Sequence, residues 1–109
     1  MNPAPPTVAV LDEVSTWPGV TTRQTPRGST AIVFAGHELG HVHLDRKTLD
    51  LPLSPERRAQ VLEAARAKEW FSNWVSKPLT DEKDAQDGLA LLRESYDELT
   101  ASWSLICSS

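Results

Sequence analysis

Alternation of apolar and polar positions, together with one apolar run rich in β-favouring residues, predicts four consecutive β-strands between residues 20 and 53. The predicted segments are Val20–Thr25, Thr30–Phe34, residues 38–45 and residues 48–53. Short turns such as Pro26–Ser29 and Asp45–Lys47 separate them, and connections of this length join antiparallel neighbours. Pro52 has no backbone donor, so it places the fourth strand at an edge or marks its end. We therefore expect a four-strand antiparallel meander.

Helical spacing of three and four residues appears on both sides of this meander. Val8, Leu11 and Val14 predict a short helix that Thr7 could cap and that Pro18-Gly19 ends. After the meander, Ser54 as N-cap and Pro55 at the first helical position predict a helix reaching about Lys68.

A short strand and a final helix complete the expected pattern. Residues 72–79 are typical of a strand with Trp74 as its anchor. Thr80-Asp81-Glu82 then opens a helix in which Leu89, Leu92 and Tyr96 keep helical spacing, the pattern of a helix packed on a sheet.

The order helix, meander, helix, strand, helix predicts an α+β fold. We expect an antiparallel sheet of about five strands flanked by three helices. With 109 residues, the chain has room for one core. We expect a flexible proline-rich tail at residues 1–6, a single domain at 7–103 and a C-terminal tail at 104–109.

Composition narrows the class of protein. The formal net charge is −4, and no basic tract is present, which counts against the alternative of a nucleic-acid-binding module. The longest apolar run, Ala31–Ala35, is too short to span a bilayer, so no membrane partner is expected. Cys107 is the single cysteine, which excludes an intrachain disulfide. Because the first residues lack the features of a secretion signal, we expect a cytoplasmic protein.

Residues 37–41 read His-Glu-Leu-Gly-His and match the H-E-x-x-H pattern of zinc peptidases. On a helix, His37 and His41 would share one zinc ion and Glu38 would activate its water. Glu63 is the candidate third ligand, since His43 would point away. A zinc-dependent hydrolase is therefore one alternative function.

The flanking residues favour a strand instead, and a strand changes the chemistry. There, His37 and His41 would lie roughly 13 Å apart, too far to share an ion. Leu39, His41 and His43 would occupy one face, where the two imidazoles could bind a metal or an anion, or transfer protons. Alternatively, both histidines are ordinary members of a sheet face, each satisfied by a neighbour.

Four tryptophans add a second kind of candidate. Trp17, Trp70, Trp74 and Trp103 could stack on a ligand, although filling a core or a groove is the commoner role in a small domain. Trp74 is the one we expect beside the histidines.

Several of these segments, in this order, carry a family resemblance. Gly36–Asp45 (Gly-His-Glu-Leu-Gly-His-Val-His-Leu-Asp) and Leu49–Leu53 (Leu-Asp-Leu-Pro-Leu) resemble the central signature of the bacterial and fungal luciferase-domain family. Trp74-Val75 and residues 91–96 (Leu-Leu-Arg-Glu-Ser-Tyr) resemble its later motifs. The resemblance covers roughly Trp17–Leu99, and the C-terminal part is also similar to the MmcQ/YjbR-like proteins.

The resemblance implies an α+β domain of MmcQ/YjbR-like type. It further implies that a histidine at the position of His37 is incidental, whereas Glu38, Gly40, His41 and His43 are features of the family. If the chain were an enzyme, the resemblance would imply a luciferase-like oxidoreductase.

We therefore expect a small binding or interaction module without demonstrated catalysis. Its ligand-binding candidates are His41, His43 and Trp74, with Glu38 as the candidate for any catalytic role. We expect no metal or other cofactor; the alternative is zinc held by His37, His41 and Glu63. A small molecule or a protein could be the partner, and a homodimer could form through an edge strand near Pro52 and the exposed tryptophans.

Overall fold

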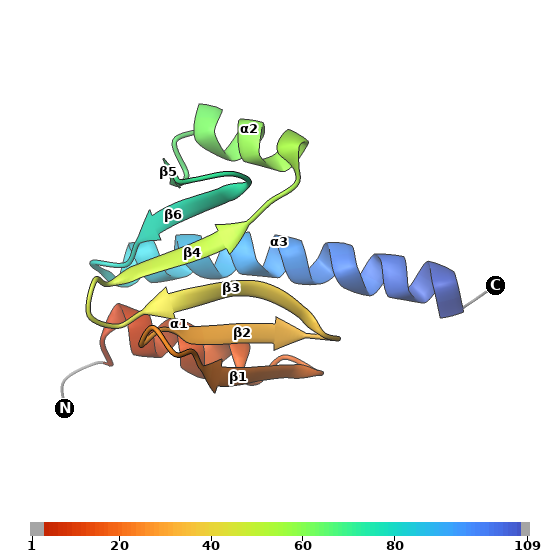
Figure 1. Ribbon diagram of the computed structural model, residues 1–109, viewed down its shortest axis with the longest axis horizontal. Coiled ribbons are helices and arrows are strands. Elements are labelled where there is room, and N and C mark those ends of the chain that lie inside the picture. The colour runs from red at the N-terminus through yellow and green to blue at the C-terminus, as the bar shows by residue number, and fades with distance from the viewer. Residues whose placement is uncertain (1–3, 108–109) are drawn as a thin grey trace.

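A computed structural model describes the backbone of residues 4–107 and the side chains of residues 4–102. Within this range three helices and six strands follow one another (Figure 1): α1 (Pro6–Val14), β1 (Val20–Gln24), β2 (Thr30–Phe34), β3 (His37–His43), β4 (Thr48–Pro52), α2 (Pro55–Glu63), β5 (Lys68–Glu69), β6 (Trp74–Pro78) and α3 (Glu82–Cys107). The predicted α+β fold with an antiparallel sheet is confirmed, with six strands in place of about five.

The strands form one sheet in the order β1-β2-β3-β4-β6-β5, and every neighbouring pair is antiparallel. The first four strands are the predicted meander. Pro52 is the last residue of β4 and pairs with Trp74 of β6, so the proline marks the end of the strand rather than an edge. Because β3 and β6 flank β4, the segment near Pro52 is not at a sheet edge, and the expected homodimer cannot form through an edge strand there.

The helices leave one face of the sheet uncovered. In Figure 1, α1 and α3 lie behind the sheet and α2 lies beyond β6 at one end. The core fills the space between the sheet and the two helices behind it. Its fully buried large side chains are Ile32, Leu49, Leu51, Leu79, Leu91 and Leu92. We call the side away from α1 and α3 the open face.

Two helix boundaries differ from the predictions. Ser54 caps α2 as expected, its hydroxyl accepting from the backbone N–H of Arg57 at 3.3 Å, but α2 ends at Glu63 rather than near Lys68. Ala65 adopts a left-handed φ of 56°, which turns the chain into β5. Thr7 does not cap α1, since that helix already begins at Pro6 with Pro5 as its N-cap residue.

The expected tails are shorter where the structure describes them. Residues 4–5 precede α1, while residues 1–3 and 108–109 lie outside the described range. Residues 104–107, expected in the C-terminal tail, continue α3. Among the described residues, no helix combines the length and apolar character needed to cross a bilayer.

A β-bulge in β3 decides which side chains face the open side. Ile32 of β2 pairs with Gly40 and the next residue, Val33, pairs with Glu38, so Leu39 is an extra residue without a partner. Leu39 turns into the core and is 2% exposed. The sequence predicted Leu39 on the face of the histidines; this was wrong because strict alternation fails at a bulge.

Candidate functional site

The open face carries a hollow of about 520 Å³ above the middle of the sheet. Its floor is formed by β3 and β4, and its walls by the turns at both ends of the strands. The lining residues are Thr25, Pro26, Arg27, Ser29, Glu38, His41, His43, Arg46, Asp50, Trp70, Phe71 and Trp74. We call this space the open-face hollow.

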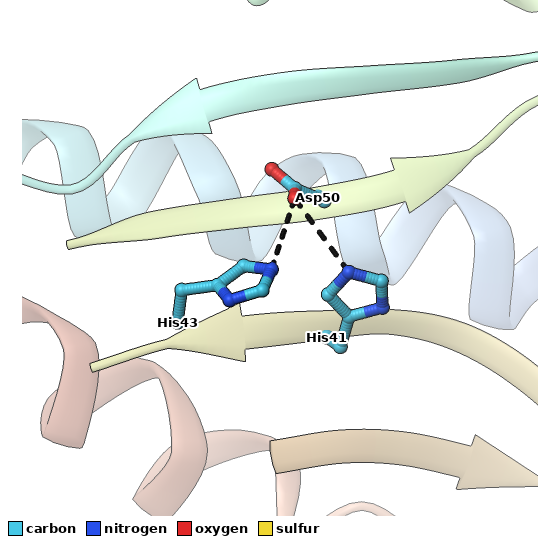
Figure 2. Close-up of side chains that lie close together, drawn as sticks. All are labelled: His41, His43 and Asp50. Carbon is cyan, nitrogen blue, oxygen red and sulfur yellow. Dashed lines mark ion pairs between the residues drawn. The ribbon is translucent and has the colours of Figure 1, made fainter. Parts of the chain in front are cut away.

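Three side chains meet on the floor of the open-face hollow (Figure 2). Asp50 of β4 pairs with His41 across the two strands, and His43 lies two residues further along β3. Asp50 Oδ2 lies 3.2 Å from His43 Nε2 and 3.6 Å from His41 Nε2. The two imidazole rings are 4.9 Å apart and nearly perpendicular, at 86°. One carboxylate oxygen therefore faces both histidines.

Asp50 is a buried carboxylate, with only 3% of the residue exposed. Burial on its own raises the pKa of a carboxyl group, but the neighbouring side chains of His41, Ser76 and His43 outweigh it and hold the pKa of Asp50 below its ordinary value. Oδ1 has no hydrogen-bond partner among the described residues. Asp50 is thus ionised, and one of its oxygens is available to another ligand.

His41 lies between two carboxylates. Its Nε2 faces Asp50, and its Nδ1 lies 2.9 Å from Glu38 Oε1. The neighbouring Asp50 carboxylate raises the pKa of His41 against the opposing effect of burial, and Glu38 adds to the rise. Each ring nitrogen faces a carboxylate oxygen, so this environment favours the imidazolium.

His43 has the opposite environment. Only 6% of it is exposed, and burial together with the charge of Arg46 lowers its pKa. Arg46 Nη2 lies 3.0 Å from Nδ1 and 3.1 Å from Nε2. The tautomer with its hydrogen on Nε2 directs that hydrogen toward the Asp50 carboxylate, and in this tautomer Nδ1 is the acceptor for Arg46. The floor therefore combines a histidine favoured as the cation with one favoured as the neutral ring.

An aromatic wall stands beside the histidines. The ring of Trp74 lies 4.9 Å from that of His41, and Trp70 and Phe71 contact each other at 5.7 Å between ring centroids. Arg58 of α2 holds this turn, donating to the carbonyl oxygens of Trp70 at 2.9 Å and Trp74 at 3.3 Å. Trp70 is 42% and Phe71 66% exposed, so two large apolar rings face solvent in a fixed turn.

Two arginines add positive charge to the hollow. Arg27 lies in the turn between β1 and β2, and Arg46 in the turn between β3 and β4. In the part of the chain that the structure describes, neither forms an ion pair with a carboxylate. By contrast, the carboxylates of Glu38 and Asp50 both face His41. The charge left without a partner in the hollow is positive.

The structure brings Glu38, His41, His43 and Trp74 together, all four being residues singled out from the sequence. Sequence reasoning missed Asp50, although a signal existed. The turn spans residues 44–47 and pairs His43 with Thr48, so Asp50 lies opposite His41; a turn limited to residues 45–47 would have placed it opposite Val42. Asp50 also stands between two buried leucines of β4, so alternation directs it away from the core.

The zinc-peptidase arrangement is wrong for this fold. His37 and His41 belong to a strand, and the bulge between them turns them to different sides. His37 lines a separate hollow beside Arg57, Ser95 and other residues of α2 and α3, whereas His41 lines the open-face hollow. Glu63 is exposed at the end of α2 and pairs with neither histidine.

The other tryptophans have separate places. Trp17 is buried in the core at 8% exposure and packs on Tyr96 at 5.3 Å between ring centroids. The side chain of Trp103 lies outside the described residues. Of the described tryptophans, Trp70 and Trp74 line the open-face hollow.

Residues 36–95 match the Luciferase domain family, a span of more than half of the 109 residues. The chain belongs to this family. The luciferase-domain match contains Glu38, His41, His43, Asp50 and Trp74, but not Arg27. Neither a curated protein nor a solved structure matches the luciferase-domain chain, and the similarity to MmcQ/YjbR-like proteins stays a prediction.

Proposed function

We propose that this luciferase-domain protein is a small-molecule-binding module whose ligand is a planar aromatic anion held in the open-face hollow. The observation that carries the proposal is the combination, in one hollow, of exposed aromatic rings and two arginines without carboxylate partners. Binding alone is proposed, with no covalent step.

The size and lining of the hollow support a small organic ligand. Its volume of about 520 Å³ falls within the roughly 300–1,000 Å³ that is typical of ligand pockets. Trp74 and Phe71 offer faces on which a flat ring can stack. Arg58 fixes the turn that carries them, so little ordering of the wall is needed when a ligand binds.

The charges of the hollow support an anion rather than a cation as the organic ligand. Asp50 and Glu38 both face His41, which neutralises part of their charge. Arg27 and Arg46 have guanidinium groups with free donors, and guanidinium matches the planar geometry of carboxylates and similar anions. A flat anion can therefore stack on the aromatic wall and direct its charge toward the arginines.

His43 supports recognition of a polar substituent. Both ring nitrogens of His41 already face carboxylates, whereas the Nδ1 of His43 becomes an acceptor whenever Arg46 moves to a ligand. A hydroxyl group at the floor can donate to this nitrogen. This arrangement favours ligands with a hydroxyl group at one end.

A fluorescence titration with 1-anilinonaphthalene-8-sulfonate, an anion with a flat naphthalene ring, tests the proposal. We expect saturable binding of one dye per chain in low salt with a chelator present. Arg27→Met should weaken binding about 2- to 5-fold, as expected for a solvent-exposed charge. Phe71→Ser should weaken it about 10-fold through loss of an aromatic contact.

Leu44→Ser is the matched control, because Leu44 is an exposed apolar residue, at 44%, that lines a different hollow near α1. Its dye affinity should equal that of the unaltered protein. Unchanged affinity in both Arg27→Met and Phe71→Ser would contradict the proposal.

A further inference from the structure

We infer that His41, His43 and Asp50 form a binding site for one divalent first-row transition-metal ion, open toward the hollow. The inference does not rest on the proposed aromatic ligand, since it concerns three side chains of the floor and an inorganic ion. It also differs from the His37–His41–Glu63 zinc arrangement, which the strand geometry separates.

The spacing of the donor atoms suits one ion. Ligand atoms of all three side chains lie within 4.8 Å of one another, and Asp50 Oδ2 lies 3.2 and 3.6 Å from the two Nε2 atoms. Two ligands on one ion with bonds of about 2.0–2.1 Å lie about 2.8–3.4 Å apart at octahedral or tetrahedral angles. The two contacts of Asp50 Oδ2 are close to this range, and rotation of the imidazoles must bring the most distant pair of ligand atoms nearer to each other.

Asp50 supplies an independent reason for a ligand at this place. Its side chain is only 5% exposed, and Oδ1 has no hydrogen-bond partner among the described residues. A buried carboxylate with an unused oxygen carries a desolvation penalty that a bound cation relieves. The unsatisfied oxygen thus belongs to the same residue that brings the two histidines together.

Glu38 has the position of an outer-shell carboxylate. Histidines that bind a metal through one ring nitrogen commonly donate the other N–H to a carboxylate or carbonyl, which fixes the ring. The Glu38 Oε1 to His41 Nδ1 contact of 2.9 Å is such a contact, and it directs Nε2 toward Asp50. The β3 bulge is what brings Glu38 to this face.

The donor set selects the class of ion. Two imidazole nitrogens and one carboxylate oxygen suit zinc, cobalt, nickel or iron(II), whereas magnesium and calcium prefer oxygen ligands. Three protein ligands leave coordination positions for water or another molecule. Those positions face the open-face hollow, because His41, His43 and Asp50 all line it.

Arg46 opposes metal binding and so provides a sharp test. When Nε2 of His43 binds a metal, its Nδ1 carries the hydrogen and no longer accepts from Arg46 Nη2, which now lies 3.0 Å away. Arg46 is exposed and must turn toward solvent. Removing it should therefore strengthen metal binding, although it lies beside the site.

The experiment is a calorimetric titration of chelator-treated, exhaustively dialysed protein with Co²⁺, followed by visible absorption. We expect one Co²⁺ per chain, micromolar affinity or tighter, and a new d–d absorption band. His41→Gln and Asp50→Asn should abolish the band, and Glu38→Gln should weaken binding about 10-fold. Arg46→Met should tighten it several-fold.

His37→Gln is the matched control and should bind as the unaltered protein does. If Asp50→Asn failed to fold by circular dichroism, the partly exposed His41→Gln would decide alone. No stoichiometric binding, equal losses in His37→Gln and His41→Gln, or weaker binding in Arg46→Met would overturn the inference. Dye binding is measured with chelator present, so failure of one proposal is distinguishable from failure of the other.

Discussion

Glu38 and His41 form a hydrogen bond of 2.9 Å on the same face of β3, although they are three residues apart. In a regular strand an odd spacing places side chains on opposite faces. Because Leu39 is an extra residue, both Leu39 and Gly40 face the core side, and Glu38 and His41 therefore share the open face. One bulge therefore decides the composition of the floor, as bulges beside functional sites often do.

Gly40 sets the separation between β3 and β4 beside Asp50. A Cβ added there would lie 2.8 Å from the Asp50 carbonyl oxygen and 3.1 Å from Leu51 Cβ. Gly40→Ala should therefore push the strands apart and lower the free energy of unfolding by about 1–3 kcal/mol. It should also weaken Co²⁺ binding, because Asp50 moves with β4. Urea denaturation and the cobalt titration measure the two effects.

Gly36→Ala provides the comparison for Gly40→Ala. Gly36 has a φ of 79° with no atom near an added Cβ, so alanine there should cost about 1 kcal/mol for the left-handed backbone without altering Co²⁺ binding. Equal metal binding in both variants would show that Gly40 does not position Asp50.

The lowered pKa of Asp84, at the start of α3, predicts that the protein loses stability in acid. Hydrogen bonds from the Thr80 hydroxyl and backbone N–H, with help from Lys77, lower the pKa of Asp84 to about 2. Its folded pKa is depressed, so the stabilisation is complete above the unfolded value of 3.8 and is lost as pH falls toward 2. Asp84→Asn should cost about 1 kcal/mol at neutral pH, as for loss of a helix cap.

Denaturant unfolding of Asp84→Asn and the unaltered protein between neutral pH and pH 2 checks this. The difference between their free energies of unfolding should shrink as pH falls toward 2. A difference that stays constant down to pH 2 would show that the Asp84 carboxylate is not its source.

The pKa values of the two floor histidines should shift in opposite directions from the ordinary value of 6.5. Asp50 and Glu38 raise the pKa of His41, so this residue contributes stability below pH 6.5 that is lost as pH rises through its folded pKa. Burial and Arg46 lower the pKa of His43, so this residue contributes stability above pH 6.5 that is lost as pH falls through its folded pKa. Ring ¹⁵N shifts of chelator-treated protein measure both, and a His43 pKa above that of His41 would refute the geometry.

Local sequence patterns were sufficient for most of the fold. The apolar run Thr30–Phe34 and the Ser54-Pro55 start of α2 depend on neighbours in the chain, so they could be predicted from the sequence. The bulge at Leu39 depends on pairing with β2, and the left-handed turn at Ala65 is formed by a residue that is ordinary in helices. Neither the bulge nor the left-handed turn has a signal in the local sequence. The sheet face of Leu39 and the end of α2 were therefore predicted wrongly.

The candidate site was predicted only in part, because some of its residues are recognisable locally and others depend on pairing between strands. His41, His43 and Trp74 were recognisable as chemical groups in strands, whereas Asp50 acquires its role only through cross-strand pairing. Trp70 and Phe71 face the hollow because Arg58 of α2 fixes their turn, a contact between distant segments that spacing alone does not reveal.

The central claim is that the open-face hollow is the binding site of this luciferase-domain protein, and ¹H–¹⁵N chemical-shift mapping with 1-anilinonaphthalene-8-sulfonate tests it most directly. We predict saturable shifts at Arg27 and Phe71 and at the indole N–H groups of Trp70 and Trp74. Shifts gathered instead at the separate hollow lined by Ala9 and residues 80–82, with the indoles unmoved, would contradict the account.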